Sequence, residues 1–86
     1  MEHIKTSTGF EADIDKSCFN DMELLDAILD IQAGNMLALP VIVSKIMGDA
    51  KKALYGHCRD EKGKVGADRI MMEVNEIVDI LNAKKS

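Results

Sequence analysis

Apolar and polar residues alternate near the N-terminus, in the stretch GFEADID. Phe10, Ala12 and Ile14 occupy one set of alternate positions, and acidic residues occupy the other. A period of two is typical of a strand with one buried face. The segment HIK can pair with this strand across TSTG, where Gly9 suits a tight turn. We therefore expect residues 1–19 to be extended, as a single strand or a hairpin.

Four helices are expected after this segment, because apolar residues then recur every three or four positions. Asn20 is the expected N-cap of the first helix, with Glu23 at the capping-box position. Pro40 suits the first turn of the second helix, and Asp49 is expected to cap the third. The expected helices span residues 21–33, 38–47, 50–59 and 67–83.

The apolar positions of these helices define the expected core. They are Leu24, Leu25, Ile28 and Ile31 in the first helix, Leu39, Ile42, Val43, Ile46 and Met47 in the second, and Ile70, Val74, Ile77 and Leu81 in the fourth. A chain of 86 residues is long enough for one such core. The pattern therefore predicts a mainly α protein: a compact four-helix domain, residues 1–86, with a short N-terminal strand or hairpin.

Composition narrows the choice of partners. The chain has 11 Lys and Arg against 15 Asp and Glu, a net charge of −4, which disfavours nucleic acid. Its longest apolar run, residues 36–43, contains Pro40 and is far shorter than the roughly 20 residues that span a bilayer. The N-terminus lacks an apolar stretch of signal-peptide length. We expect a cytoplasmic protein with no nucleic-acid or membrane partner.

His57 and Cys58 are the strongest candidates for chemistry. On a helix, adjacent side chains diverge by about 100°, so the two residues are poorly placed to bind one ion. The other cysteine, Cys18, is 40 positions away and forms no paired metal-binding motif. In the alternative to a reactive pair, Cys58 packs as a small apolar residue. We expect no catalytic residue, no metal site and no cofactor.

A surplus of apolar residues points to a binding module instead of an enzyme. Met71 and Met72 are adjacent and cannot both face one core. The stretch NMLALPVIV is apolar on every side of a helix, and methionine is common on surfaces that accept varied apolar partners. The alternative is that these residues fill gaps in the core. The candidate partner-binding residues are Leu37, Val41, Val43, Met71 and Met72, and such a surface is also compatible with a homo-oligomer.

Five phrases, in this order, make the sequence similar to the small tail assembly chaperones of long-tailed bacteriophages and related prophages: GFEADID, NDMELLDAILDI, ALP, LYGHCRDEKGKV and IMMEVNEIVDIL. The resemblance covers about residues 9–81 and depends on order and spacing. It matches residues 59–60 and 63–65 as the loop and start of the last helix. The chain departs from it at Cys58, where an aliphatic residue is expected, and at Gly66, where proline is common.

The resemblance implies a helical protein of the bacterial host cytoplasm that binds the tape measure protein while tail tube subunits assemble, without catalytic residues. Many such chaperones also have an extended form made by ribosomal slippage, for which the codons of Lys84 and Lys85 are candidates. One alternative is a small acidic regulatory protein that binds and inhibits a basic partner. A third is an enzyme that uses His57 and Cys58.

Overall fold

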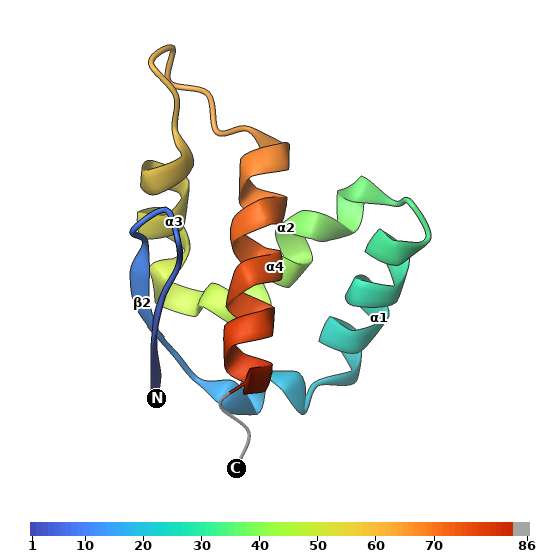
Figure 1. Cartoon of the computed structure of the whole chain (residues 1–86). Coiled ribbons are helices and arrows are strands. Elements are labelled where there is room, and N and C mark those ends of the chain that lie inside the picture. The colour runs from blue at the N-terminus through green and yellow to red at the C-terminus, as the bar shows by residue number, and fades with distance from the viewer. Residues whose placement is uncertain (84–86) are drawn as a thin grey trace.

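The computed structural model describes residues 1–83 and is mainly helical, with a short antiparallel hairpin at the N-terminus (Figure 1). This confirms the mainly α class and the hairpin. The strands are β1 (Glu2–Lys5) and β2 (Glu11–Ile14), and the helices are α1 (Met22–Gln32), α2 (Leu39–Met47), α3 (Lys51–Cys58) and α4 (Ala67–Ala83). Short 3-10 turns span Lys16–Phe19, Met36–Ala38 and Gly48–Ala50.

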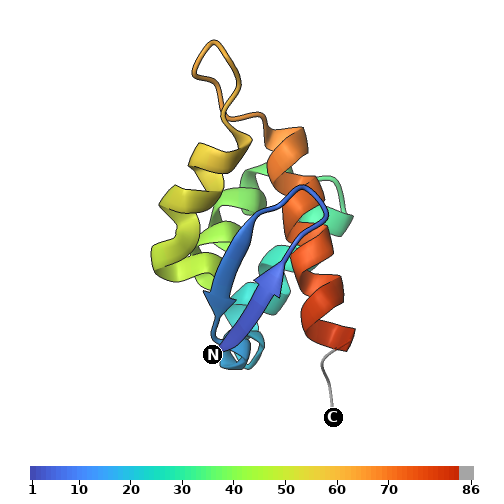
Figure 2. The same ribbon diagram turned by 60° about the vertical axis from the view of Figure 1, so that its left-hand side comes forward.

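The hairpin places its apolar residues on the side of the helices. Ile4 lies opposite Ala12 in the antiparallel register, and Ile4, Phe10 and Ile14 are buried. The amide of Thr6 donates to the carbonyl of Phe10 at 2.8 Å and closes the turn. Since a two-stranded hairpin is marginal in water, these side chains need the cover of the helices. Figure 2 shows the hairpin lying against α4, with α3 on its other side.

The extended N-terminal segment is shorter than predicted. Extended structure ends at Ile14, and Lys16–Phe19 forms a 3-10 turn instead of the expected extension to residue 19. The carboxylate of Asp15 accepts a hydrogen bond from the amide of Ser17 at 2.9 Å and so caps this turn. The side chain of Ser17, and after it the backbone amide of the same residue, lower the pKa of Asp15 by hydrogen bonding to its carboxylate.

The prediction of four separate helices is corrected. Helix α2 leads through the 3-10 turn Gly48–Ala50 directly into α3, with no loop between them. The helices described within residues 1–83 therefore form three stretches along the chain: α1, the run from Met36 to Cys58, and α4. Gly48 has a φ of 52°, which lets the chain bend at this point without strain. Asp49 does not cap α3. The N-cap position is occupied by Ala50, and no side chain accepts a capping hydrogen bond there.

Helix α1 begins one residue later than predicted because its cap is Asp21. The Asp21 carboxylate accepts hydrogen bonds from the amides of Glu23 at 2.9 Å and Leu24 at 3.4 Å. Asn20 instead ends the preceding 3-10 turn, where its backbone N–H donates to the carbonyl of Ser17. The ammonium of Lys45 on α2 lies 2.9 Å from the other oxygen of Asp21 and lowers the pKa of that carboxyl. One side chain thus caps α1 and joins it to α2.

The core surrounds α2, which lies behind α4 in Figure 1. All five residues expected on the buried face of α2 are buried, as are the four expected on α4. On α1 the prediction is right for Leu24, and Ile28 and Ile31 are half-buried against the core. It is wrong for Leu25, which is exposed because it lies about 100° around the helix from the buried Leu24.

Candidate functional site

A buried carboxylate fastens the hairpin to the last helix. Glu73 lies in the middle of α4 and is only 4% exposed. The hydroxyl of Thr6 donates to one of its oxygens and the hydroxyl of Thr8 to the other, each at 2.8 Å. Beside them, the amide and hydroxyl of Ser7 both donate to Glu76, one turn further along α4. These bonds offset the cost of removing the Glu73 carboxylate from water.

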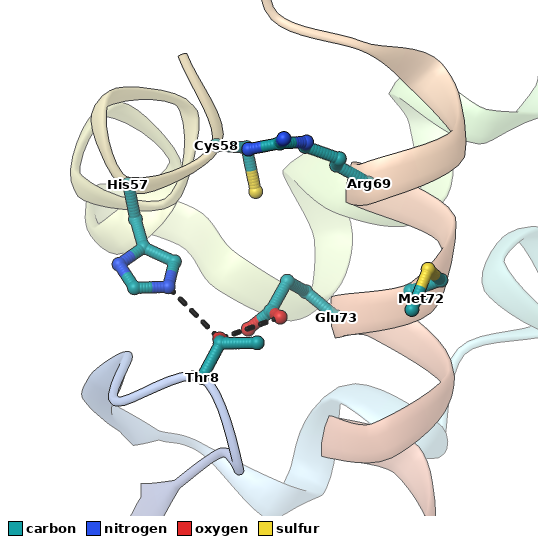
Figure 3. A pocket seen from close by; sticks show the side chains of 6 residues that line it. All are labelled: Thr8, His57, Cys58, Arg69, Met72 and Glu73. Atoms are coloured by element: carbon teal, nitrogen blue, oxygen red, sulfur yellow. Dashed lines mark hydrogen bonds between the residues drawn. The ribbon is translucent and has the colours of Figure 1, made fainter. Parts of the chain in front are cut away.

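His57 joins this network through Thr8. Its Nε2 atom lies 2.9 Å from the Thr8 hydroxyl, as Figure 3 shows. Since Thr8 has one hydroxyl proton and donates it to Glu73, we assign the proton of this second bond to His57 Nε2. A nucleophile activated by histidine needs the opposite direction, with the imidazole accepting the hydroxyl proton. In this arrangement His57 holds the hairpin turn and does not activate Thr8.

Cys58 has the environment of a core residue. It is buried among the apolar residues of the core, which confirms the prediction that it packs as a small apolar side chain. Burial raises the pKa of its thiol, the negative charge of Glu73 raises it further, and Arg69 opposes the shift. A protonated, buried thiol is a poor nucleophile. Cys58 therefore lies in an environment that keeps its thiol protonated.

These groups line a small pocket between α3, α4 and the hairpin turn. The pocket measures about 210 Å³ and is lined by Thr8, His57, Cys58, Arg69, Met72 and Glu73 (Figure 3). Within residues 1–83, every buried side-chain nitrogen or oxygen has a hydrogen-bond partner. The buried carboxylate of the pocket, Glu73, is thus satisfied by Thr6 and Thr8, which favours a structural role.

Glu73 and its threonine partners are not among the residues predicted from the sequence. One local signal was present, because Glu73 follows Ile70 by three positions and precedes Ile77 by four. That spacing places it on the buried face of α4. The threonines carry no such signal, since only the folded chain brings the hairpin turn to this helix.

The five predicted partner-binding residues do not share one surface. Leu37 and Met72 are 85% and 67% exposed, and Val41 is also exposed. Met71 is half-buried against the core. Val43 is 0% exposed, so its assignment to a contact surface is wrong in this fold. It follows Leu39 by one helical turn and therefore lies on the same buried face of α2.

Helix α1 has an exposed apolar surface that was not predicted from the sequence. Met22, Leu25 and Leu29 are exposed and are spaced by three and four positions, so they form one stripe along the helix. Helix α1 thus has one apolar face on the core and a second on its outer surface. Seven of its eleven residues are apolar, more than one buried face needs, and this excess was the available signal.

Two grooves border α1. The groove with α2 is lined in part by Leu37 and Val41, together with acidic residues of α1. The groove with α4 is more apolar, and Met71 lies in its wall. The predicted residues are therefore divided: Leu37 and Val41 border one groove, Met71 the other, and Met72 the pocket beside Thr8.

No protein-family model, curated protein or solved structure matches the chain. Among the helices in residues 1–83, none is both long enough and apolar enough to cross a membrane. No three histidine, cysteine or acidic residues of the described part form a group that could hold a metal ion.

Proposed function

We propose that the chain is a tail assembly chaperone of a long-tailed bacteriophage or prophage. In this role it binds the tape measure protein in the host cytoplasm and assists assembly of the tail tube around it. The proposal is supported by the ordered sequence phrases that resemble this family and by a helical fold with apolar side chains left in solvent.

The observation that carries the proposal is the amount of exposed apolar surface on a small domain. The large apolar residues that are exposed are Met1, Met22, Leu25, Leu29, Met36, Leu37, Val41 and Met72. Scattered single residues of this kind are normal, but the three on α1 form a continuous stripe. A surface of this type can cover apolar segments of a long helical client.

The net charge of −4 complements this binding mode. An apolar client segment that is covered by an acidic protein acquires a charged, repulsive exterior, which keeps complexes apart in solution. The bound protein would thus prevent aggregation of the tape measure protein until tube subunits replace it.

Co-expression with a candidate tape measure protein from the same genome tests the proposal. We expect the soluble yield of that client to rise and the two proteins to elute together in size-exclusion chromatography. As a control, Leu24→Asp places a charge in the core and should abolish the effect by unfolding the chaperone. A client that stays equally insoluble with and without the chain would refute the proposal.

One observation favours a second candidate, the small acidic regulator of a basic partner. Helix α1 carries Glu23, Asp26 and Asp30 and has no lysine or arginine. A regulator of this kind would bind through charge, so its affinity should fall steeply with added salt. Binding to the long helical client that persists in high salt would argue for the chaperone.

The extended form made by slippage remains a separate proposal. Lys84 and Lys85 lie outside the described residues, so the gene decides this point. An A-rich heptamer at the lysine codons and an open −1 frame beyond Ser86 would support it, and the lack of either would refute it.

A further inference from the structure

The groove between α1 and the start of α2 combines an apolar rim with three carboxylates. It measures about 380 Å³ and lies between α1 and the chain that turns back from it through the 3-10 turn Met36–Ala38 (Figure 1). Ala27 and Ala38 are buried at its base, where their small side chains leave space between the helices. Leu37 and Val41 are exposed along its rim.

The turn before α2 holds Leu37 at the rim. The side-chain oxygen of Asn35 accepts a hydrogen bond from the backbone N–H of Leu37 at 3.2 Å, and the backbone N–H of Asn35 donates to the carbonyl of Asp30 at 2.9 Å. These bonds tie the turn to the end of α1, while the side chain of Leu37 stays 85% exposed. An apolar side chain on a fixed backbone is suited to anchor a partner, because little conformational freedom is lost on binding.

The charge of this groove is negative and largely unbalanced. Glu23, Asp26 and Asp30 line it from α1, and their spacing of three and four positions places them along one side of that helix. The one cation of the lining is Lys45, whose ammonium lies 2.9 Å from Asp21 and 3.9 Å from Glu23. Within residues 1–83, neither Asp26 nor Asp30 forms an ion pair. Two carboxylates of the groove are therefore available to the cations of a partner.

A second copy of the chain does not complement this groove. A two-fold contact would set the carboxylates of one α1 helix against those of the other. A head-to-tail contact would need a segment that is both basic and apolar. Most cations of residues 1–83 lie on α3 and the loop after it, where no large apolar residue is exposed. Arg69 and Met72 on α4 supply only one cation for the two carboxylates.

We infer that this groove binds an amphipathic helix of the tape measure protein, whose apolar face covers Leu37 and whose lysine or arginine side chains pair with Asp26 and Asp30. The inference rests on the proposed function, which supplies the partner. Asp26 and Asp30 are one helical turn apart, so two cations one turn apart on the partner match them. A helix fits better than a strand, because the groove is bordered by helices and offers no open backbone edge for pairing.

Binding of a purified candidate tape measure protein to matched variants tests the inference. The double variant Asp26→Lys/Asp30→Lys reverses the charge of the groove, and Leu37→Asp puts a charge on its rim; all three positions are exposed, so the fold should persist. We expect each variant to raise the Kd about tenfold or more. Added salt should reduce the effect of the double variant, because exposed charge pairs are screened, and should leave that of Leu37→Asp.

The control variants make the same changes outside the groove. Glu61→Lys/Asp79→Lys alters the net charge equally, on the loop after α3 and on α4, and Met72→Asp puts a charge on another exposed apolar residue. Both should keep a Kd close to that of the wild type. If circular dichroism shows that Asp26→Lys/Asp30→Lys disturbs the fold, Asp26→Asn/Asp30→Asn removes the two charges without adding others and should weaken binding in the same direction.

A charge-swap experiment identifies the paired cations. Overlapping peptides of the tape measure protein first locate the bound segment, which should combine apolar residues at helical spacing with two lysine or arginine residues one turn apart. Replacing both of these residues by glutamate should weaken binding to the wild-type chain and restore binding to Asp26→Lys/Asp30→Lys. A bound segment without such a pair of cations would overturn the inference.

The outcomes separate the inference from the function it rests on. If the wild type binds and the groove variants bind equally well, the groove inference is wrong and the chaperone proposal stands. Loss of binding in Leu25→Asp with full binding in Leu37→Asp would also overturn it, in favour of the outer stripe of α1. A wild-type dimer that Leu37→Asp dissociates would assign the groove to a second copy and overturn it too. If the wild type does not bind at all, the proposed function fails, and the inference fails with it.

Discussion

Glu73 in the last helix accepts a hydrogen bond from the hydroxyl of Thr6, which precedes it by 67 positions, at a distance of 2.8 Å. Both side chains are buried. Together with the bond from Thr8, this contact fixes the hairpin against α4 and gives the N-terminal segment its place in the domain.

Substitution of Glu73 should destabilise the fold. Glu73→Ala removes the acceptor of two threonine hydroxyls and leaves the buried one, on Thr6, with only the Thr8 hydroxyl and the Phe10 amide as partners. A hydrogen bond to a charged group contributes about 1.5–3 kcal/mol. We expect the free energy of unfolding in urea to fall by about this amount. Thr6→Val should act in the same direction, and a double-mutant cycle of the two should show coupling above about 0.5 kcal/mol. Additive effects would contradict the contact.

The two apolar faces of α1 should respond differently to truncation. Leu24 is fully buried, so Leu24→Ala should lower the free energy of unfolding by about 2–5 kcal/mol. Leu29 lies on the same helix and is 62% exposed, so Leu29→Ala should change it by less than about 0.5 kcal/mol. Equal losses in the two variants would mean that the outer stripe is covered in solution, and size-exclusion chromatography would then reveal the self-association.

The cap of α1 should be sensitive to acid. Asp21→Ala removes both the cap of α1 and the ion pair with Lys45, whereas Asp21→Asn removes only the ion pair. Asp21→Ala should therefore lower the melting temperature more than Asp21→Asn. Because Lys45 holds the folded pKa of Asp21 below the usual 3.8, this stabilisation is present above that pH and is lost as the pH falls through the lowered pKa. Asn20→Ala is the control and should have little effect.

The hairpin should be stabilised most at mildly acidic pH. The ring nitrogens of His3 contact Asp13 at 2.8 Å and Glu11 at 3.0 Å, and these hydrogen bonds raise the pKa of His3 above 6.5. The stabilisation is complete below pH 6.5 and is lost as the pH rises through the raised pKa. His3→Gln should therefore lower the melting temperature at about pH 5.5 and have less effect at about pH 8.5. A histidine pKa at or below 6.5 by NMR would contradict this.

Cys58 should resist alkylation in the folded protein. Its thiol is buried and its pKa is raised, so iodoacetamide should modify it more slowly than free glutathione. Cys18 is half-buried and should be modified first, which mass spectrometry of the digested protein can resolve. In urea both cysteines should react alike. Faster reaction of Cys58 than of glutathione would revive the enzyme hypothesis.

Strong periodicity made α4 predictable from sequence. Its expected range, 67–83, agrees with the observed helix, and its four expected core residues are buried. The spacing of apolar residues is a local property, so it needs no knowledge of the rest of the chain. The hairpin was predictable for the same reason, because its alternation and its turn are both local.

The errors come from contacts that join distant parts of the chain. Asn20 and Asp21 are both good caps by residue type, and the choice depends on the preceding 3-10 turn and on Lys45. The exposure of Leu25 depends on which face of α1 meets the rest of the core, which the spacing of its apolar residues leaves open. Likewise, the role of Glu73 requires threonines from the other end of the sequence.

The fastening of the hairpin to α4 has a consequence for the order of folding during synthesis. The hairpin leaves the ribosome well before α4, because its acceptors Glu73 and Glu76 follow Thr6 and Ser7 by 67 and 69 positions. A lone hairpin is marginally stable, so the N-terminal residues should stay unstructured until α4 has emerged. Thus the hairpin, although it is translated before α4, is expected to become ordered only after that helix.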